Sequence, residues 1–290
     1  MPLIHLRDSR PGDGNYRHLE AGSVLFFERA PFEIPQGERD ILLGARQAGG
    51  SHHKNIAYKP AGDKVTGTRD AQDLHAVLRS YSHRSIQFLR ELLPRYMEGC
   101  RIDYASFRPE EEEGRALPTN KRNDLLHVDA FPTRPTGGDL ILRIFTNVNP
   151  VEKRVWLVSD PFVEAARAHA AAAGLFKVSA GGASPVRRLL AAAGLKSARR
   201  TPYDRFMLGF HDYLKRSETF QRDCPKYRLE FPPGASWIVF TDIVPHAVLS
   251  GRYALEQTVI IPRNNLLDRR NSPVDILQEL CCRPLIPAAS

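Results

Sequence analysis

The segment LLHVDAFPTRP, residues 125–135, carries a histidine and an aspartate two positions apart, His127 and Asp129. In a β-strand, residues i and i+2 project from the same face, so both side chains would be near enough to bind one metal ion. An imidazole and a carboxylate on one face supply two ligands of the 2-His-1-carboxylate triad, which holds non-haem Fe(II) and leaves coordination positions open. Alone, the pair also suits an ordinary strand end with two polar residues.

A second histidine has to come from another strand, and His246 is the candidate. It follows the run SWIVFTDIVP, residues 236–245, and precedes a second run, AVLSGRYALEQTVIIP, residues 247–262. In a jelly roll, strands distant in the sequence pair with one another, so the long stretch between the two histidines is no obstacle. His127, Asp129 and His246 are therefore the predicted metal ligands and catalytic centre.

The composition is that of a globular protein, with 290 residues of which 42% are hydrophobic and 26% charged. The net charge of +8 favours acidic partners, such as nucleic acid, an anionic membrane surface or a substrate with phosphates and carboxylates, without choosing among them. Four cysteines without a Cys-x-x-Cys pair indicate a reducing compartment. With no secretory signal and no run of about 18 apolar residues, we expect a cytoplasmic protein that can touch a membrane surface.

Strand and helix patterns predict an α+β fold, with a double-stranded β-helix (jelly-roll) core flanked by helices. The expected parts are a supporting region of helices and strands (1–98), jelly-roll strands (99–158 and 225–263) and a helical insertion (159–224), all in a single domain over residues 1–290. The polar run EEEEGRALPTNKRND, residues 110–124, is predicted as a surface loop. No Gly-x-Gly-x-x-Gly or Walker phosphate loop is present, which argues against those nucleotide-binding folds.

Two arginines are candidates for binding a co-substrate. A dicarboxylate that chelates the metal through a keto-acid end needs a fixed cation for its far carboxylate, and the planar guanidinium suits this task. Arg252 comes six residues after His246, and Arg143 lies on the strand after the His-x-Asp pair. Asn147 has the strand parity of Arg143; it either lines the same pocket or closes the strand end before Pro150.

The segment HVDAF, followed far downstream by TDIVPHAVLSGRYALEQT, resembles the Fe(II)/2-oxoglutarate-dependent dioxygenase superfamily. The resemblance implies Fe(II) as the metal, with 2-oxoglutarate and O2 as co-substrates. In prolyl-hydroxylase-like members, an arginine in a similar RYA context binds 2-oxoglutarate, which would be Arg252 here. Other members anchor the co-substrate from the strand that carries Arg143. Both arginines are expected to line the site, and the choice of anchor stays open.

A narrower resemblance covers most of the chain. The run LHVDAFPTRPTGGDLILRIFTNVNP, the later RVWLV and the run FTDIVPHAVLSGRYALEQTVIIP are similar to the Kdo 3-hydroxylase family of Gram-negative bacteria. This family hydroxylates 3-deoxy-D-manno-oct-2-ulosonic acid (Kdo) at C3 on lipid A precursors. The resemblance implies a Kdo-lipid A substrate in lipopolysaccharide biosynthesis, a peripheral location at the inner membrane and no nucleic-acid partner.

The basic and aromatic residues near the predicted metal pair agree with an acidic sugar as substrate. Arg154 and Trp156 share a strand face, where a guanidinium can bind the carboxylate while the indole packs on the sugar ring. Arg108 and Arg134 complete the predicted substrate-binding residues. The alternatives are that both arginines are solvated surface charges and that Trp156 belongs to the core.

The sequence also fits three other functions. One is a 2-oxoglutarate-dependent hydroxylase of another acidic substrate. Another is a non-catalytic jelly-roll module that binds anionic glycans or nucleic acid, and the third is a hydrolytic zinc site, since zinc takes the same ligands. No metal role is predicted for His52, His53, His75, His83, His169 or His211. The sequence does not fix the oligomeric state or which Kdo unit is modified.

Overall fold

Three strands that are buried over their whole length form the centre of the structure: β6 (Leu140–Asn147), β9 (Ser236–Phe240) and β11 (Ala254–Ile261). β6 lies between the other two and is antiparallel to both. Largely apolar strands are expected where both faces of a sheet are covered.

This computed structural model describes residues 3–6, 10–45, 55–69, 71–114, 117–180 and 200–287.

In the described part of the chain, the large sheet has eight strands in the order β1-β2-β9-β6-β11-β5-β3-β4. Neighbouring strands are antiparallel except for β1 and β2. The outer members are β1 (Leu3–His5), β2 (Val24–Phe27), β3 (Ile56–Lys59), β4 (Lys64–Thr66) and β5 (Arg101–Arg108). The region 1–98, expected as support for the core, thus contributes strands to the large sheet itself.

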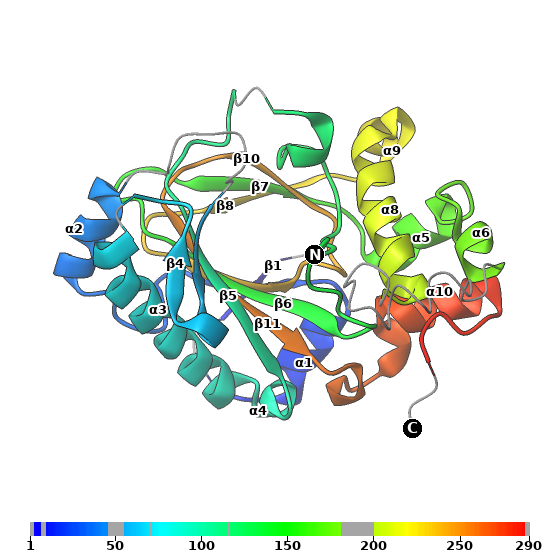
Figure 1. Cartoon of the computed structure of the whole chain (residues 1–290), viewed down its shortest axis with the longest axis horizontal. Coiled ribbons are helices and arrows are strands. Elements are labelled where there is room, and N and C mark those ends of the chain that lie inside the picture. The colour runs from blue at the N-terminus through cyan, green and yellow to red at the C-terminus, as the bar shows by residue number, and fades with distance from the viewer. Residues whose placement is uncertain are drawn as a thin grey trace.

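The small sheet faces the large one across the jelly roll (Figure 1) and has the order β10-β7-β8 in the described residues. Its strands are β7 (Arg154–Val158), β8 (Tyr227–Phe231) and β10 (His246–Ser250). The jelly-roll core predicted from the sequence is therefore confirmed. The strands β5–β11 fall inside the predicted ranges 99–158 and 225–263, whereas β1–β4 of the large sheet lie outside them.

The segment around His127 is not the strand that the sequence predicts. It joins the edge of the small sheet through an isolated bridge, in which His127 N–H donates to His246 O (3.1 Å) and His246 N–H donates to His127 O (2.9 Å). Two residues later, Asp129 N–H donates to the carbonyl of Thr241 (2.9 Å) in the loop before β10. The chain leaves the ladder because this amide has a partner outside the strand.

Aromatic side chains from both sheets fill part of the interior. Trp237 on β9 stacks on Phe231 of β8, with ring centroids 3.8 Å apart, and on Phe145 of β6 at 5.2 Å. Trp156 on β7 meets Trp237 edge-on at 5.5 Å. Each such ring buries about 150–250 Å². This cluster therefore joins the two sheets and fixes the position of β7, which carries two of the predicted site residues.

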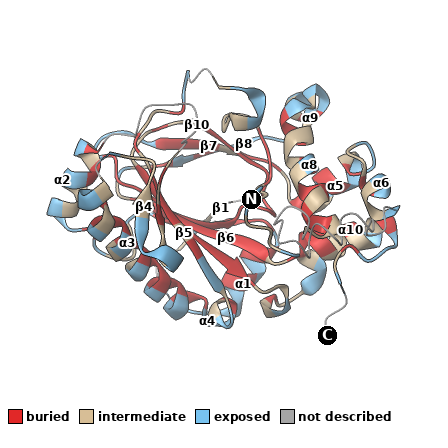
Figure 2. Cartoon of the chain, in the orientation of Figure 1, coloured by how far each residue is buried: buried red, intermediate tan, exposed pale blue. Residues whose placement is uncertain are grey.

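Helices from the first 98 residues cover the outer face of the large sheet. They are α1 (Asp13–Glu20), α2 (Gln36–Gly44), α3 (Ala71–Leu92) and α4 (Pro94–Met97). The apolar spacing of α3 places one face on the sheet, and Figure 2 shows that face buried and the opposite face exposed. The buried residues of α3 and α4 include Leu74, Val77, Leu78, Tyr81, Ile86, Leu89 and Tyr96.

A second group of helices lies beside the jelly roll, at the right of Figure 1. The group consists of α5 (Phe162–His169), α6 (Leu175–Ala180), α8 (Pro202–Arg216) and α9 (Glu218–Asp223) from the predicted insertion, with α10 (Pro273–Cys281) from the end of the chain. Short 3-10 helices are η1 (Pro60–Gly62), η2 (Thr119–Lys121), η4 (Arg263–Asn265) and η5 (Arg269–Asn271). Residues 181–199, where the alanine-rich pattern predicts helix, lie outside the described residues.

The helix α8 starts at a capping box in which Thr201 and Asp204 bond each other's backbone amides. The capping box fixes where α8 begins, and a later turn of α8 brings His211 against His127. No helix among the described residues is long and apolar enough to cross a membrane.

Gly251, which follows β10, packs closely against Arg154 at the start of the neighbouring strand β7. Its φ is +107°, and a Cβ there would lie 2.8 Å from the Cα of Arg154. We expect Gly251→Ala to lower the free energy of unfolding by about 2–4 kcal/mol in denaturant titrations. The matched control is Gly209→Ala in α8, where a Cβ meets nothing within 4 Å, and helix propensity should raise the free energy of unfolding by about 1 kcal/mol. Equal effects of the two changes would contradict the packing argument.

Candidate active site

The structure brings together the three predicted metal ligands. One potential ligand atom from each of His127, Asp129 and His246 lies within 4.8 Å of the other two. The bridge between the two histidines sets their backbones side by side, and the bond from Asp129 N–H to Thr241 fixes the carboxylate beside them. Both histidines are 5% exposed, so the group lies inside the protein. The three residues predicted as ligands from the sequence therefore lie together in the folded structure.

The hydrogen bonds of the two imidazoles leave one nitrogen of each ring for a metal. Nδ1 of His127 donates to the carbonyl of Leu125 (2.7 Å), and Nδ1 of His246 donates to that of Val244 (2.9 Å). A carbonyl only accepts, so Nδ1 carries the proton and Nε2 presents its lone pair. Burial lowers the pKa of both histidines, which keeps the rings neutral as metal binding requires.

The carboxylate of Asp129 is charged and incompletely paired. Burial alone would raise its pKa, but the guanidinium of Arg143, 3.1 Å from Oδ2, helps to hold the pKa well below its usual range. Oδ2 nevertheless has no well-directed hydrogen bond. A buried carboxylate oxygen without such a bond calls for an explanation, and a divalent transition-metal ion between Asp129 and the two Nε2 atoms provides one.

Aromatic contacts fix the orientation of both imidazoles. Trp156 stacks on His246 with ring centroids 5.2 Å apart and 20° between the planes. On the other side, His211 of α8 meets His127 edge-on at 4.8 Å, and its own Nδ1 donates to the carbonyl of Val128 (2.8 Å). Two walls of the site therefore come from β7 and from the helical insertion. These contacts leave the rings little freedom to rotate.

A small cavity opens next to the triad. Its volume is about 40 Å³, enough for a few water molecules. The residues that line it are Arg108, Asn123, His127, Asp129, Arg143, Phe145, Arg154, Trp156, His246 and Val248. Three arginines thus face the same space as the metal ligands, and the cavity is suited to a small anion that contacts the metal.

Buried charges alternate along this cavity. Arg143 lies 3.1 Å from Asp129 and 2.9 Å from Glu256, and Arg108 lies 2.5 Å from the other oxygen of Glu256. Glu112 is 3.9 Å from Arg108 and 3.9 Å from Arg154. The chain of charges runs, in order, through Asp129, Arg143, Glu256, Arg108, Glu112 and Arg154. Burial is tolerated because each charge has neighbours of opposite sign.

Known proteins similar to this chain agree with a metal site of this kind. The family model for 3-deoxy-D-manno-oct-2-ulosonic acid (Kdo) hydroxylases matches residues 5–284. The chain belongs to the Kdo hydroxylase family. It is 34% identical, over 100% of its length and 99% of the other chain, to the Kdo hydroxylase KdoO, described as a non-haem Fe(II) alpha-ketoglutarate-dependent dioxygenase, in its apo form, with a TM-score of 0.87. No curated protein matches the chain.

Two further structures of KdoO are similar to this chain. In complex with alpha-ketoglutarate and Fe(III), the identity is 33% and the TM-score 0.85. In complex with succinate and Fe(III), the identity is 33% and the TM-score 0.86. In both cases the match covers 100% of this chain and 99% of KdoO.

Within this Kdo hydroxylase family member, not every predicted binding residue reaches the cavity. Arg252 donates from Nε to the carbonyl of Pro109 (3.2 Å) and lies over the ring of Tyr253. The Nδ2 amide of Asn147 bonds the carbonyls of Glu152 and Phe231, at 2.9 and 3.0 Å. The structure thus brings Arg143 into the cavity, but not Arg252 or Asn147.

Of the residues predicted to bind substrate, Arg108, Arg154 and Trp156 line the cavity. Arg154 and Trp156 share its wall as expected from their spacing. Arg134 instead pairs with Asp103 at 2.9 Å and lies over the ring of Tyr104 at 4.0 Å, outside the residues that line the cavity. Its contacts are those of a partly exposed charge, the alternative noted for this residue.

Four polar residues near the site were not predicted from the sequence: Glu112, Asn123, Glu256 and Lys215. Glu112 is 6% exposed, which corrects the prediction that residues 110–124 are simply a surface loop. Its burial follows from the buried arginines, which the sequence places on other strands. The position of Lys215 could have been predicted, since it lies four residues after His211 in the predicted helix and therefore on the same helix face.

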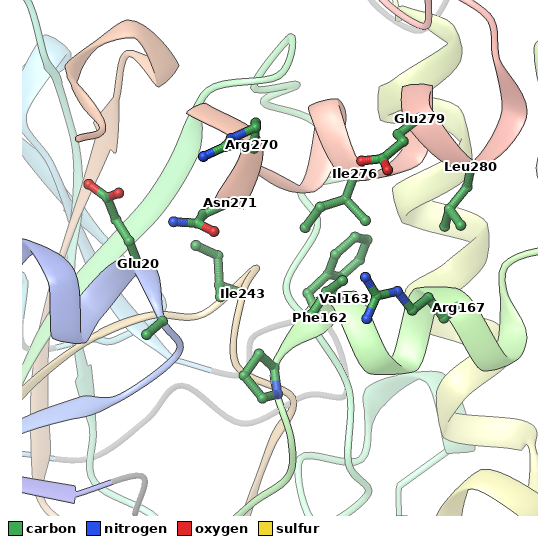
Figure 3. Close-up of a pocket in the computed structure, with 12 residues that line it drawn as sticks. Glu20, Phe162, Val163, Arg167, Ile243, Arg270, Asn271, Ile276, Glu279 and Leu280 are labelled. Carbon is green, nitrogen blue, oxygen red and sulfur yellow. The ribbon is translucent and has the colours of Figure 1, made fainter. Parts of the chain in front are cut away.

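A larger pocket, about 370 Å³, lies away from these residues, against α5, α10 and the end of α1 (Figure 3). Phe162, Ile243 and Ile276 give it an apolar lining, and the guanidinium groups of Arg167 and Arg270 point along its edges. Both arginines are paired with nearby carboxylates. None of the predicted site residues lines this pocket, so we assign it no part in the reaction.

Lys215 is a buried cation with one weak hydrogen bond, from Nζ to the carbonyl of Asn120 at 3.4 Å. Burial lowers its pKa to about 8. Its pKa in the unfolded chain is higher, near 10.5, so unfolding takes up a proton between about pH 8 and 10.5. Below about pH 8 the residue is charged in both states, and its burial costs stability in full. That cost disappears as the pH rises from 8 towards 10.5.

We therefore expect Lys215→Met to raise the free energy of unfolding at pH 7 by about 1–3 kcal/mol. The gain over the unmodified protein should shrink as the pH approaches 10. Denaturant titrations at both pH values measure the difference. The exposed Lys226→Met serves as control and should show no such dependence; a gain for Lys215→Met that is equal at both pH values would contradict the argument.

Proposed function

We propose that this chain uses Fe(II), 2-oxoglutarate and O2 to hydroxylate Kdo at C3 on Kdo-lipid A, in lipopolysaccharide biosynthesis. The observation that carries the proposal is the joining of two neutral imidazoles and one carboxylate beside a cavity lined by three arginines. Such a site can hold a metal and a small organic acid together. Membership of the Kdo hydroxylase family supports the choice of sugar.

His127, Asp129 and His246 would hold the iron on one face and leave positions for co-substrates. When bound, iron with 2-oxoglutarate and O2 supplies the oxidation: the keto acid loses CO2 to give succinate, and one oxygen atom enters a C–H bond of the substrate. The role of the chain is geometric and electrostatic. The backbone carbonyls of Leu125 and Val244 keep each Nδ1 protonated, and Trp156 and His211 hold the rings in place.

Arg143 is the better supported anchor for 2-oxoglutarate. It lines the cavity beside Asp129, whereas Arg252 binds the backbone of Pro109 and does not line it. Its guanidinium is fixed by Glu256 at 2.9 Å. A planar cation held in this way is suited to a carboxylate.

Arg108, Arg154 and Trp156 are proposed to bind the sugar acid. Arg154 and Trp156 come from neighbouring positions on one face of β7, so a carboxylate on the guanidinium would place the sugar ring near the indole. Arg134 lies apart from this group, and its partly exposed position suits a contact with the anionic lipid rather than with the reacting sugar. The net charge of +8 also favours a phosphate-bearing substrate and a peripheral position at the inner membrane.

The proposal is tested by anaerobic incubation of the protein with Fe(II), followed by O2, 2-oxoglutarate and Kdo-lipid A. Mass spectrometry should show a gain of one oxygen atom on the Kdo, with an equal release of succinate. Succinate release with other acidic acceptors, but not with Kdo-lipid A, would indicate a different substrate. No consumption of 2-oxoglutarate with any acceptor would contradict the proposed reaction class.

Loss of one ligand should remove the metal. We expect His246→Ala to weaken Co(II) binding by at least about 100-fold, because even the partners of a ligand are typically worth 10–100-fold. Hydroxylation should be lost together with the metal. The change in the Co(II) absorption spectrum on titration measures binding directly. His75→Ala, which removes a partly exposed imidazole paired with Asp63, is the control and should bind Co(II) normally.

The two arginines predicted to anchor 2-oxoglutarate should differ in effect. We expect Arg143→Gln to raise the KM for 2-oxoglutarate by about 10–100-fold, because a charge-assisted pair is lost. Arg252→Gln should leave this KM within about twofold, since its guanidinium does not reach the cavity. Steady-state kinetics at saturating Fe(II) measure both. The opposite ranking would mean that Arg252 moves into the site when the co-substrate binds.

A further inference from the structure

Arg134 is a partly exposed cation that lies over two aromatic rings. Its guanidinium carbon is 4.0 Å from the ring centroid of Tyr104 and 4.5 Å from that of Phe131. Its Nε donates to the carboxylate of Asp103 (2.9 Å). Cation–π contacts and a charge-assisted hydrogen bond together restrict a guanidinium to one orientation. Arg134 is therefore held in place although 28% of its side chain is exposed.

The end of this guanidinium is free to bind a ligand. The bond to Asp103 uses Nε alone, and neither terminal nitrogen of Arg134 has a hydrogen bond to the part of the chain that the structure describes. These terminal nitrogens carry most of the N–H donors of an arginine. A fixed fork of donors that reaches solvent is suited to bidentate binding of an oxyanion, because little freedom is lost when the anion arrives.

Lys59 adds a second positive charge at the same place. It is the last residue of β3, and its Nζ lies 5.4 Å from the ring centroid of Tyr104 on the paired strand β5. Lys59 has no ion pair with any residue that the structure describes. Two cations thus contact one tyrosine ring, while Asp103 supplies a single carboxylate. The charge around Tyr104 is therefore positive and favours an anion.

Phe131 connects this surface to the cavity beside the metal ligands. Arg143 lines the cavity, and its guanidinium lies 5.5 Å from the same ring that Arg134 contacts. Phe131 also follows the metal ligand Asp129 by two residues. Arg134 itself does not line the cavity. It is therefore placed for a part of the ligand that stays outside the cavity while another part enters it.

A phosphate group fits this position better than a carboxylate. A phosphate monoester carries a charge of about −1.5 to −2 at pH 7 and has several strong acceptor oxygens, so it can bind the fork of Arg134 and still attract Lys59. The keto acid is not a candidate, because its carboxylates are needed at the metal and at Arg143. The phosphate would belong to the lipid part of the substrate.

We propose that Arg134 is a subsite, outside the metal cavity, for a phosphate group of the lipid substrate. The proposal rests on the proposed function for the identity of the substrate, and it adds a ligand group that the metal cavity does not bind. Lys59 strengthens the field, while Tyr104 and Phe131 position the guanidinium. Such a subsite favours the phosphorylated lipid over the same lipid without phosphates, since only the first pairs with the fork.

The test compares Kdo-lipid A with the same lipid after a phosphatase has removed its phosphates, both in detergent micelles. With the full-length, Fe(II)-loaded protein, the KM for the dephosphorylated lipid should be about tenfold higher, because charge-assisted hydrogen bonds are lost. Arg134→Gln should raise the KM for Kdo-lipid A by about tenfold and so remove the difference between the two lipids. The effect should lie in KM rather than in kcat, because the contact is far from the reacting atoms.

The control is Arg228→Gln, which removes the same charge from an exposed position on β8, where Arg228 pairs with Glu230 at 3.2 Å. This variant should keep the difference between the two lipids. If it also removes the difference, net charge rather than a subsite is responsible, and the inference fails.

The positioning role of Tyr104 has a separate readout. Tyr104→Leu removes the ring, and we expect it to raise the KM for Kdo-lipid A by about threefold, the value of an exposed cation–π contact. Tyr104→Phe keeps the ring and should restore the affinity of the unmodified protein. Equal KM values for the leucine and phenylalanine variants would show that the ring does not hold Arg134.

The remaining outcomes separate the inference from the proposed function. Equal KM values for the two lipids with the unmodified protein would contradict the subsite and leave the proposed function intact. An equal effect of Arg134→Gln on both lipids would mean that a carboxylate of the sugar binds there, which contradicts the phosphate subsite. If the unmodified protein hydroxylates neither lipid, the proposed function fails and the inference fails with it.

A second measurement needs no variant and covers the case in which Arg134→Gln does not fold. Methyl phosphate, added at constant ionic strength, should raise the apparent KM of the unmodified protein for Kdo-lipid A but not for the dephosphorylated lipid. Equal inhibition with both lipids would place the phosphate in the metal cavity. Either that result or no inhibition with Kdo-lipid A would overturn the proposal.

Discussion

Burying charge inside an apolar barrel is the constraint on which the rest of this structure depends. Three arginines and three carboxylates alternate through the interior, and each is tolerated because the next has the opposite sign. A divalent metal and a doubly charged keto acid would add charges that cancel. The site can therefore take up both ligands together at less electrostatic cost than either alone, which gives a physical reason for the two to occupy adjoining positions.

Both sheets supply residues of this site. The large sheet supplies Arg108 and Arg143, while β7 of the small sheet supplies Arg154 and Trp156. The aromatic cluster fixes the separation of the sheets, and with it the width of the cavity. The helical insertion closes the remaining side by placing His211 against His127. A residue of each layer therefore touches the metal ligands or their neighbours.

Much of this could be predicted from the sequence, because strand and helix periodicity are local properties. The His127–Asp129 pair, the central strands and the apolar face of α3 could be predicted from spacing, and His246 from its place between two strand patterns. Glu112 and Glu256 could not be found in this way, since their burial depends on arginines from other strands. Arg252 follows His246 closely in sequence, but it sits between Gly251 and Tyr253, which both have positive φ, and this turn directs it to Pro109. Closeness in sequence to His246 therefore did not predict that the side chain of Arg252 would reach the cavity, because the backbone turns between them.

The backbone bridge between His127 and His246 also bears on how the protein is made. One histidine emerges from the ribosome long before the other, and the whole helical insertion is synthesised between them. Until β10 has been added and paired, the growing chain has only a histidine and an aspartate, a weak pair of ligands. Metal capture is thus delayed until the jelly roll closes, so that a redox-active ion enters a finished cavity rather than an open chain.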